Sequence, residues 1–441
     1  MKYRSMLENA LSSKKVLALL FALAIVLPAV LYTNAYAWLK IMPTNKDVFL
    51  FHYAAQAAFN FDMSPYGLVD TPDPNVTAPH VPFLYHPGAI ILFAPFAFLS
   101  YEQAYVAMVL VNVVCLVGLF YLVCFRILKL TIEKDLLIIV SLLLFVGFFR
   151  PMEVQFQHGQ VNLILACLLC GFWLAARKNA QLVAGALLAT AVVIKTYPVL
   201  LLLFLLIDRR IKLVGTTIAF GFGYFVLSLI IFPVGLWFEW LLEVAPNGGY
   251  GKTPEGMFSP AYWSNQGING VVSRLFVELS EQHLSENLWV RPIFVSAELA
   301  RYSGYLIAFS VLGVSLWSLW RLRKKNPKAF IDMAMMIMIP MIFLLGPLAW
   351  DHHTVYVLPV SMIFVAWVLR SNSDAPSPIL SIFAIVAAAL LAMPMISVLW
   401  ALNVTFWGVF ILWASACWMA WHGRSVFEEQ AERSDRKLES A

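Results

Sequence analysis

Residues 180–207 read AQLVAGALLATAVVIKTYPVLLLLFLLI, and Lys195 is the single charged side chain among them. Basic pairs at 177–178 and 209–210 flank this stretch. A straight helix needs about 20 apolar residues to cross a bilayer, and basic residues mark the cytoplasmic ends of membrane helices. The stretch must therefore leave the cytoplasmic side and return to it. It turns near Pro198, because proline breaks a helix, so the sequence predicts a membrane hairpin of two short arms.

The composition of the whole chain points to the same class of protein. Of the 441 residues, 61% are hydrophobic and 12% are charged, against about 25% charged in soluble proteins. The mean hydropathy is +0.79. These values exclude an ordinary soluble, disordered or fibrous protein, and we expect no nucleic-acid partner. We predict an all-α polytopic membrane protein.

The apolar stretches predict about twelve membrane crossings. We expect them at residues 16–37, 104–125, 136–150, 161–176, 180–194, 196–207, 211–232, 301–320, 330–349, 354–369, 379–398 and 404–421. An even number puts both termini on one side. Because 22 of the 30 Lys and Arg residues fall on that side, it is predicted to be cytoplasmic. The first crossing is expected to be an uncleaved signal anchor, and residues 88–99 a re-entrant or half-crossing segment.

The opposite, extracytoplasmic side carries two long loops, at residues 38–86 and 237–300. The first holds two basic and four acidic residues, net −2, and the second three basic and seven acidic residues, net −4. Long loops stand on this side and short connectors on the other. We therefore expect the function on the extracytoplasmic side.

Ionisable side chains at membrane depth are costly, so each of them is a candidate functional residue. Outside the cytoplasmic clusters, the candidates are Asp47, Arg150, Glu153, His158, Lys195, Asp351, His352 and His353.

Asp47 opens a segment whose apolar residues recur with helical spacing, while His52, Tyr53 and Gln56 lie toward the other side. We expect a helix on the outer membrane surface with a carboxylate in its first turn. The carboxylate is either functional or a cap at the rim.

The same loop ends in Phe83-Leu84-Tyr85-His86-Pro87. Tyr85 and His86 are either members of the interfacial aromatic belt or substrate contacts.

Lys195 lies at the turn of the predicted hairpin. It either extends to the outer headgroups or provides a point charge for a phosphate. Arg150 faces the same compartment. The amides of Gln160 and Asn162 stand nearby at the mouth of the next predicted helix.

Asp351, His352 and His353 follow one another at the outer end of a predicted helix. Adjacent residues of a helix point about 100° apart and chelate a metal poorly, so we expect no metal and no cofactor. We favour a role for this cluster as an acid, a base or a phosphate contact. The alternative is that these residues lie at the membrane interface without a function.

The second outer loop holds a polar cluster, Ser264-Asn265-Gln266-Gly267-Ile268-Asn269-Gly270, followed by Arg274. The amides of Asn265, Gln266 and Asn269 suit recognition of polyhydroxyl groups, although the chemistry of loop turns would also produce them.

An ordered series of these motifs resembles a known family. The series runs from Asp47 through Tyr85-His86-Pro87, Gly159-Gln160-Val161-Asn162, Lys195-Thr196-Tyr197-Pro198 and Asn265-Gln266 with Asn269-Gly270 and Arg274 to Trp350-Asp351-His352-His353. It covers residues 16–370. The chain resembles the GT-C class of integral-membrane glycosyltransferases, and within it family 87, the polyprenyl-phosphate-mannose-dependent α-mannosyltransferases and related arabinofuranosyltransferases.

This resemblance implies a polyprenyl-phosphate-sugar donor, bound from the outer leaflet, and an inverting transfer to a hydroxyl of a glycolipid or glycan. It implies an acidic residue of the first outer loop at the reaction centre, which maps onto Asp47 as base or as orienting group. Lys195 and one of His352 or His353 would hold the phosphate, with Arg274 or Arg150 as further contacts. A histidine base oriented by Asp47 is the alternative assignment.

The resemblance and the charge and hydropathy patterns together predict the layout of the chain. Residues 1–370 would form a GT-C-like catalytic bundle with both outer loops, residues 371–421 two further membrane helices, and residues 422–441 a cytoplasmic tail. The location would be the cell (inner) membrane, with both termini cytoplasmic, the active site extracytoplasmic and membrane lipids as further partners. The alternatives are transfer of arabinofuranose, an oligosaccharide ligase, a non-catalytic lipid-binding scaffold and a transporter.

Overall fold

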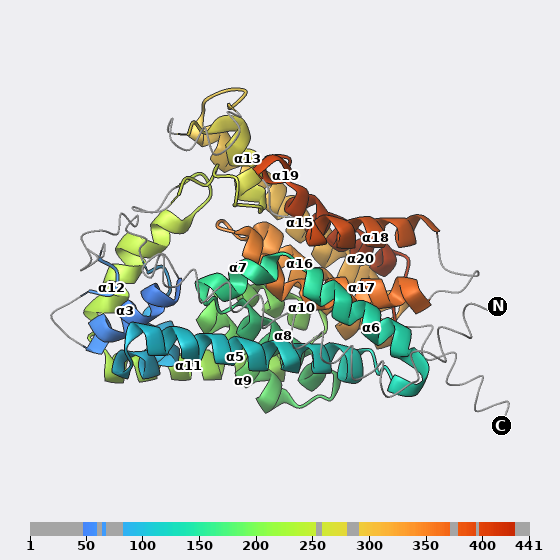
Figure 1. Ribbon diagram of the computed structural model, residues 1–441, viewed down its shortest axis with the longest axis horizontal. Coiled ribbons are helices and arrows are strands. Elements are labelled where there is room, and N and C mark those ends of the chain that lie inside the picture. Colours follow the sequence, from blue (N-terminus) through green and yellow to red (C-terminus); the bar gives the residue numbers. More distant parts are fainter. Residues whose placement is uncertain are drawn as a thin grey trace.

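The computed structural model describes residues 47–59, 64–67, 83–252, 258–279, 291–370, 378–393 and 397–427. Within these ranges the chain is helical, and its β-structure is limited to one isolated bridge between Asn265 and Trp350 (Figure 1). The predicted crossing at 16–37 and most of the predicted tail lie outside the described residues. The prediction of an all-α protein is confirmed.

Eleven predicted crossings fall on observed helices. These are α5 (Tyr101–Tyr121), α6 (Ile132–Phe148), α8 (Asn162–Arg177), α9 (Gln181–Ile194), α10 (Leu201–Ile207), α11 (Ile211–Ile231), α15 (Ala297–Lys325), α16 (Phe330–Leu345), α17 (Leu358–Arg370), α18 (Pro378–Ala392) and α20 (Val404–Trp421). The shorter elements are α3 (Asp47–Phe59), α4 (Pro87–Phe93), η1 (Ala94–Phe98), η2 (Leu122–Ile127), α7 (Pro151–His158), η3 (Tyr197–Leu200), α12 (Gly235–Glu239), η4 (Trp240–Val244), η5 (Ala245–Gly248), α13 (Ile268–Phe276), η6 (Pro327–Ala329), η7 (Asp351–Tyr356) and α19 (Ser397–Ala401).

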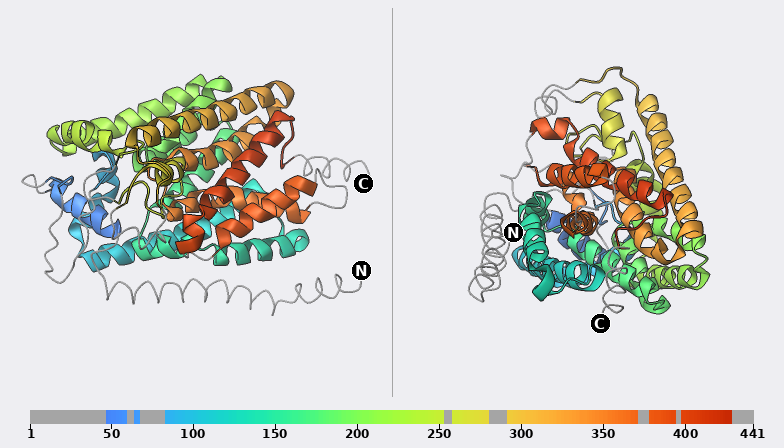
Figure 2. Two further views of the ribbon diagram at one scale, coloured as in Figure 1. Left: turned by 90° about the horizontal axis from the view of Figure 1, so that it is seen from above. Right: turned by 90° about the vertical axis from the view of Figure 1, so that its right-hand side faces the viewer.

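The helices are those of a multi-pass membrane protein. Among the described residues, five helical stretches are long and apolar enough to cross a bilayer: 101–127, α11, α15, 327–345 and α20. The bent pair α7–α8 can form a sixth. The long helices α5, α11 and α15 run along the long axis of the molecule (Figures 1 and 2). Twelve crossings stay a prediction, because the other apolar helices are shorter.

The predicted basic clusters meet at one end of the bundle, which we call the basic end. Arg177 at the end of α8 pairs with Asp332 at the start of α16. Arg323 of α15 lies 3.3 Å from Asp208, which follows α10. Arg370, the last residue of α17, lies 3.1 Å from Asp135 of α6. α6 and α17 reach the right-hand side of Figure 1, whereas α3 and α12 lie at the left.

Burial separates the central helix from the peripheral ones. α16 is buried on nearly all sides and is rich in methionine, whose flexible side chain fills irregular gaps. On α11 and α15, large apolar side chains point outward: Phe222 is 63% exposed, Ile230 75%, Leu306 69% and Phe309 68%. In a membrane protein such faces contact lipid.

The structure corrects one prediction about α3. The helix does begin at Asp47, with that carboxylate in its first turn. However, the predicted polar side does not include His52, although Gln56 is exposed. His52 is buried, and its Nε2 lies 2.9 Å from the carbonyl oxygen of Leu99. α3 packs against α4, η1 and α5, because its alanines allow close approach on several sides.

Candidate active site

A sharp elbow between α7 and α8 brings distant parts of the chain together. The two helices are bent by 113°, and Gly159 at the elbow has φ +63°. A Cβ at this position would lie 3.0 Å from Cβ of Val48, the second residue of α3. Glycine alone combines the left-handed conformation with this close approach. The elbow therefore seats His158 beside Asp47.

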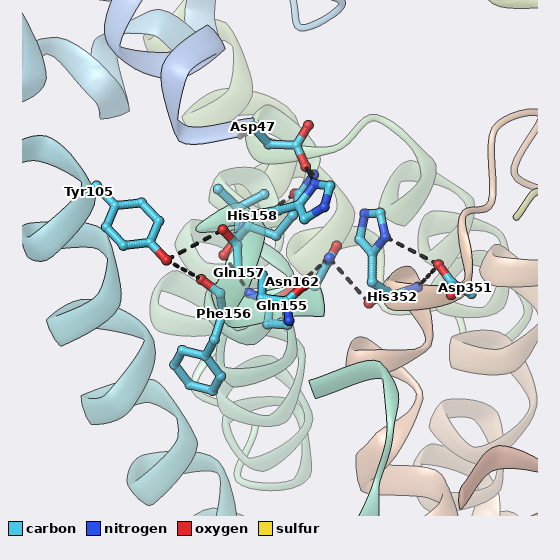
Figure 3. Close-up of polar contacts among 11 residues, drawn as sticks. Asp47, Tyr105, Gln155, Phe156, Gln157, His158, Asn162, Asp351 and His352 are labelled. Carbon is cyan, nitrogen blue, oxygen red and sulfur yellow. Dashed lines mark hydrogen bonds and ion pairs between the residues drawn. The ribbon is translucent and has the colours of Figure 1, made fainter. Parts of the chain in front are cut away.

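Asp47 accepts two hydrogen bonds from the elbow. His158 Nδ1 lies 2.9 Å from Asp47 Oδ2, and Gln160 Nε2 donates to the same oxygen over 2.7 Å (Figure 3). Burial raises the pKa of Asp47, but the hydrogen bond and charge of His158, with smaller effects of His352 and Gln160, outweigh it and lower the pKa to about 2. Asp47 is therefore held as an ionised carboxylate whose side chain is 24% exposed.

A buried amide network fixes the elbow from below. Asn112 of α5 donates to the carbonyl oxygen of Gln160 over 3.0 Å. Gln155 donates to Asn112 over 3.1 Å, and Asn162 donates to Gln155 over 2.9 Å. Asn162 also donates to the carbonyl oxygen of His352 over 3.4 Å. Hydrogen bonds are strong in a buried, low-dielectric environment, so these bonds link the elbow to α5 and to η7.

The turn η7 brings the Asp351–His353 cluster to the elbow. The His352 ring stacks on that of His158 at 5.7 Å and 29° (Figure 3). It also lies 4.7 Å from the His353 ring at 84°. Asp351 accepts from the backbone N–H of His352 over 2.8 Å, and its Oδ1 lies 3.3 Å from His352 Nδ1. All three side chains are buried. Asp351 therefore orients His352.

Lys195 lies at the break between α9 and η3, in extended conformation. Its side chain is 7% exposed, which contradicts the alternative that it extends to the headgroups. Burial lowers the pKa of Lys195 to about 7, against the opposing effect of the charge of Asp47. Burial lowers the pKa of His353 as well, and the charge of Lys195 lowers it further. Asp47, Lys195 and η7 therefore share one electrostatic environment.

Several buried polar atoms of this cluster have no hydrogen-bond partner within the described part of the chain. They are Lys195 Nζ, His352 Nε2, His353 Nδ1 and Asn162 Oδ1. Leaving such atoms unpaired costs free energy, and their concentration beside Asp47 is typical of a ligand site. Three of the four are nitrogens, which suits an anionic group. No three His, Cys, Asp or Glu side chains of the described residues are placed to hold a metal ion.

The sequence model of glycosyltransferase family 87 matches residues 83–347, which is more than half of the chain. The chain belongs to glycosyltransferase family 87. The match begins after Asp47 and ends before Asp351. The structure places both of these residues beside the α7–α8 elbow, which lies inside the matched range.

Two curated relatives have the same name, polyprenol-phosphate-mannose-dependent alpha-(1-2)-phosphatidylinositol mannoside mannosyltransferase. The protein from Mycolicibacterium smegmatis is 25% identical over 307 residues, which cover 66% of this chain and 64% of the relative. The protein from Mycobacterium tuberculosis is 24% identical over 342 residues, 75% of this chain and 67% of the relative. This family 87 chain thus aligns with about two thirds of each relative's length. No solved structure matches it significantly.

Not every residue predicted from the family 87 motifs reaches the cluster. Arg274 of α13 is buried and donates to the carbonyl oxygen of Tyr262 over 3.0 Å and to Asn403 at the start of α20. Arg150 pairs with Glu153, and its side chain is 42% exposed. None of these contacts reaches Asp47, Lys195 or η7. In this family 87 fold Arg274 therefore connects α13 to the start of α20, whereas Arg150 pairs locally within the first turn of α7.

The amides of the second outer loop bind backbone. Asn265 donates to the carbonyl oxygens of Pro260 and Pro347 over 3.1 Å each, and it accepts from the N–H of Ala349 over 3.1 Å. Asn269 donates to the carbonyl oxygen of Pro347 over 2.8 Å. Gln266 donates through its side chain to the carbonyl oxygen of Trp263 over 2.6 Å. In this structure these three amides therefore shape the loop that leads into η7.

Tyr85 and His86 differ in their surroundings. Tyr85 packs edge-on against Phe51 at 5.5 Å, and burial together with the charge of Asp47 raises its pKa, so it lies near the carboxylate. His86 stacks on Trp237 at 5.5 Å and contacts Trp240 edge-on at 5.6 Å. Burial lowers the pKa of His86 to about 4. His86 therefore belongs to a neighbouring aromatic cluster.

The role of His158 could not be predicted from the sequence, although the residue stood among the ionisable candidates. Its partner Asp47 is 111 positions away. The one local feature that singles out His158 in the sequence is its position directly before Gly159-Gln160. A turn at this glycine fixes the direction in which the histidine side chain leaves the helix.

Proposed function

We propose that this family 87 protein transfers a sugar, most simply mannose, from a polyprenyl-phosphate-sugar donor to a hydroxyl group of a glycolipid or glycan acceptor. The names of the two relatives support the donor and the class of acceptor. One structural observation carries the proposal. The ionised carboxylate of Asp47 lies beside two buried imidazoles and the buried Lys195, whose Nζ has no hydrogen-bond partner among the described residues.

These groups suit a single displacement with inversion at the anomeric carbon. Asp47 accepts the proton of the acceptor hydroxyl, and the oxygen forms a bond to the anomeric carbon. The bond from that carbon to the phosphate oxygen breaks, and its electron pair leaves with the polyprenyl phosphate. Base catalysis of this kind typically contributes about 10²–10⁴-fold to the rate.

Lys195, with His352 or His353, takes the role of phosphate-binding group in this proposal. Preorganised donors in a site that excludes water stabilise developing negative charge strongly. The phosphate also places negative charge near Asp47, which raises the pKa of that carboxyl and makes it a better base in the donor complex. A histidine base oriented by Asp47 is the alternative assignment, and His158, whose Nδ1 lies 2.9 Å from Asp47 Oδ2, is the histidine placed for it.

The membrane arrangement is part of the proposal. The catalytic cluster and the basic end lie at different ends of the elements that connect them: α8 begins at the elbow and ends at Arg177. With the basic end cytoplasmic, the cluster faces the extracytoplasmic side of the cell membrane. A GT-C-type bundle of about twelve crossings with two structured outer loops is consistent with the helices observed.

The experiment uses the full chain in nanodiscs with radiolabelled polyprenyl-phosphate mannose and a lipid extract of its host as acceptor. We expect label in a new glycolipid or glycan, with the opposite anomeric configuration to the donor by NMR. A parallel arm with polyprenyl-phosphate arabinofuranose tests the sugar. Transfer from neither donor, by protein that binds neither donor, contradicts the proposal.

A further inference from the structure

Four tryptophans gather at the basic end, where α15 and α20 finish side by side. Trp317 and Trp320 of α15 are 51% and 42% exposed, and Trp418 and Trp421 of α20 are 39% and 37% exposed. The Trp317 ring lies 5.1 Å from that of Trp320 and 6.4 Å from that of Trp421. The two helices therefore present three adjoining indoles, and Trp418 lies three positions before Trp421 on α20.

A cation lies over three of these rings. Arg321 Cζ is 4.1 Å from the ring centre of Trp421, and Lys324 Nζ is 3.5 Å from that of Trp320. Arg424 Cζ is 5.7 Å from that of Trp418. We call the four tryptophans with Arg321, Lys324 and Arg424 the tryptophan patch.

The charge of the patch is not neutralised within the described part of the protein. Other arginines at the basic end have carboxylate partners: Arg177 pairs with Asp332, Arg323 with Asp208 and Arg370 with Asp135. The three patch cations have none there. The carboxylate residue of α15, Glu298, lies in the first turn of that helix, at the end opposite the patch. Helix α20 contains no carboxylate residue.

The outer face of α15 shows how the patch meets the bilayer. Leu306, Phe309, Trp317, Trp320 and Lys324 recur at spacings of three, four or their sums, so they share one face of the helix. The first two are 69% and 68% exposed. Along this face apolar side chains give way to tryptophans and then to a cation. This is the order of hydrocarbon, interface and headgroup region across half a bilayer.

Helix C-termini favour cations, which accounts for basic residues in the last turns. It does not account for four exposed indoles grouped around three cations, two on α15 and one just after α20, that have no carboxylate partner among the described residues. We propose that the tryptophan patch binds the headgroup phosphate of an anionic phospholipid in the leaflet at the basic end. The indoles contact the glycerol and upper acyl region, and Arg321, Lys324 and Arg424 contact the phosphate. This inference does not depend on the proposed transfer activity.

The test is a lipid titration of the purified full chain in detergent, read by native mass spectrometry. Phosphatidylglycerol and phosphatidylcholine with identical acyl chains are compared. We expect the wild-type chain to prefer phosphatidylglycerol. Each basic residue near an anionic headgroup contributes about fivefold to affinity at low ionic strength. The triple variant R321Q/K324Q/R424Q should therefore lose about 100-fold in phosphatidylglycerol affinity and little in phosphatidylcholine affinity.

A matched control removes three charges from the same end without touching the patch. Lys134, Lys178 and Lys212 are exposed, and K134Q/K178Q/K212Q should keep phosphatidylglycerol affinity within about threefold. Equal losses in the two triple variants, or no preference in the wild type, would overturn the proposal. If the patch variant fails to fold, the wild-type protein alone tests the proposal. Its affinity for phosphatidylglycerol must fall with added salt while its affinity for phosphatidylcholine does not, and equal salt dependence would overturn the proposal.

Discussion

At the scale of single residues, the state of Asp47 depends on the two side chains that bind it. Burial by itself would keep this carboxyl protonated to higher pH, and His158 reverses the effect. Gln160 fixes the same oxygen without changing charge. Within the described residues both of these hydrogen bonds reach Oδ2, and the other carboxylate oxygen, Oδ1, accepts none from them. That oxygen is therefore the one we assign to the acceptor hydroxyl.

Replacing His158 by Phe should move the acid limb of the pH profile. Asp47 then loses a hydrogen bond and a neighbouring charge, so its pKa rises from about 2 to its ordinary value of 3.8 or above. The pH at which kcat/KM falls to half its plateau should rise by about 1–2 units. The measurement is kcat/KM between pH 2 and 8: the wild type should stay near its plateau down to about pH 3, and the variant should fall to half its plateau near about pH 4. Gln157→Ala is the control, because Gln157 bonds to Glu153 instead. If the plateau value of kcat/KM falls but the pH of half-maximal kcat/KM does not move, then His158 does not set the pKa of Asp47.

Lys195 gives donor binding its own pH dependence. The pKa of Lys195 is about 7 in the ligand-free protein, so its cationic form dominates below pH 7 and disappears above it. The donor phosphodiester keeps its charge over this range. Donor affinity should therefore fall by about tenfold for each pH unit above 7. Lys195→Arg should bind donor without this fall, because arginine stays protonated. Equilibrium binding of labelled donor from pH 6 to 9 is the measurement, and a flat wild-type profile would contradict the assignment.

At the scale of the elements, the α7–α8 elbow does most to build the site. Its geometry requires glycine at position 159, and its amides bond to α5 and η7. The sequence predicted that a helix opens at Asn162, which the structure confirms. It did not reveal α7 or its 113° bend. Both depend on packing against Val48, a contact between residues about a hundred positions apart that helical periodicity cannot report.

Gly159→Ala should damage both stability and activity. The left-handed conformation costs a residue with a Cβ about 1–2 kcal/mol, and the new Cβ meets Val48 at 3.0 Å. The free energy of unfolding should fall by at least that amount, and transfer should fall because His158 and Asp47 move apart. Gly215→Ala is the control. Gly215 is within α11 with nothing within 4 Å of an added Cβ, so alanine there should stabilise by about 0.5–1 kcal/mol. If Gly159→Ala and Gly215→Ala change the thermal unfolding of the protein equally, the elbow does not require glycine at position 159.

At the scale of the whole molecule, charge and hydropathy predicted the arrangement better than they predicted the site. Apolar stretches placed eleven helices, because burial in lipid needs long uncharged runs. The basic clusters were expected together, and ion pairs such as Arg323–Asp208 hold them at one end. The site was harder. Asn265 was a candidate for sugar recognition, but its amide bonds to Pro260, Pro347 and Ala349, contacts that only the folded loop creates.

The orientation in the membrane can be tested by cysteine labelling in intact cells. Asn247, near the catalytic end, and Lys178, at the basic end, are both exposed. A membrane-impermeant maleimide should label Asn247→Cys in intact cells and Lys178→Cys only after permeabilisation. The unsubstituted chain controls for its five native cysteines, all of which are buried or partly buried. The reverse pattern would place the catalytic cluster in the cytoplasm.

The most direct test of the central claim compares Asp47→Asn with wild type in one nanodisc preparation, measuring donor binding and sugar transfer separately. Asparagine keeps the size of the side chain and cannot accept the acceptor's proton. We predict that the variant binds polyprenyl-phosphate mannose as wild type does, while transfer falls by about 10²–10⁴-fold. Transfer at the wild-type rate by the Asp47→Asn protein would contradict the account.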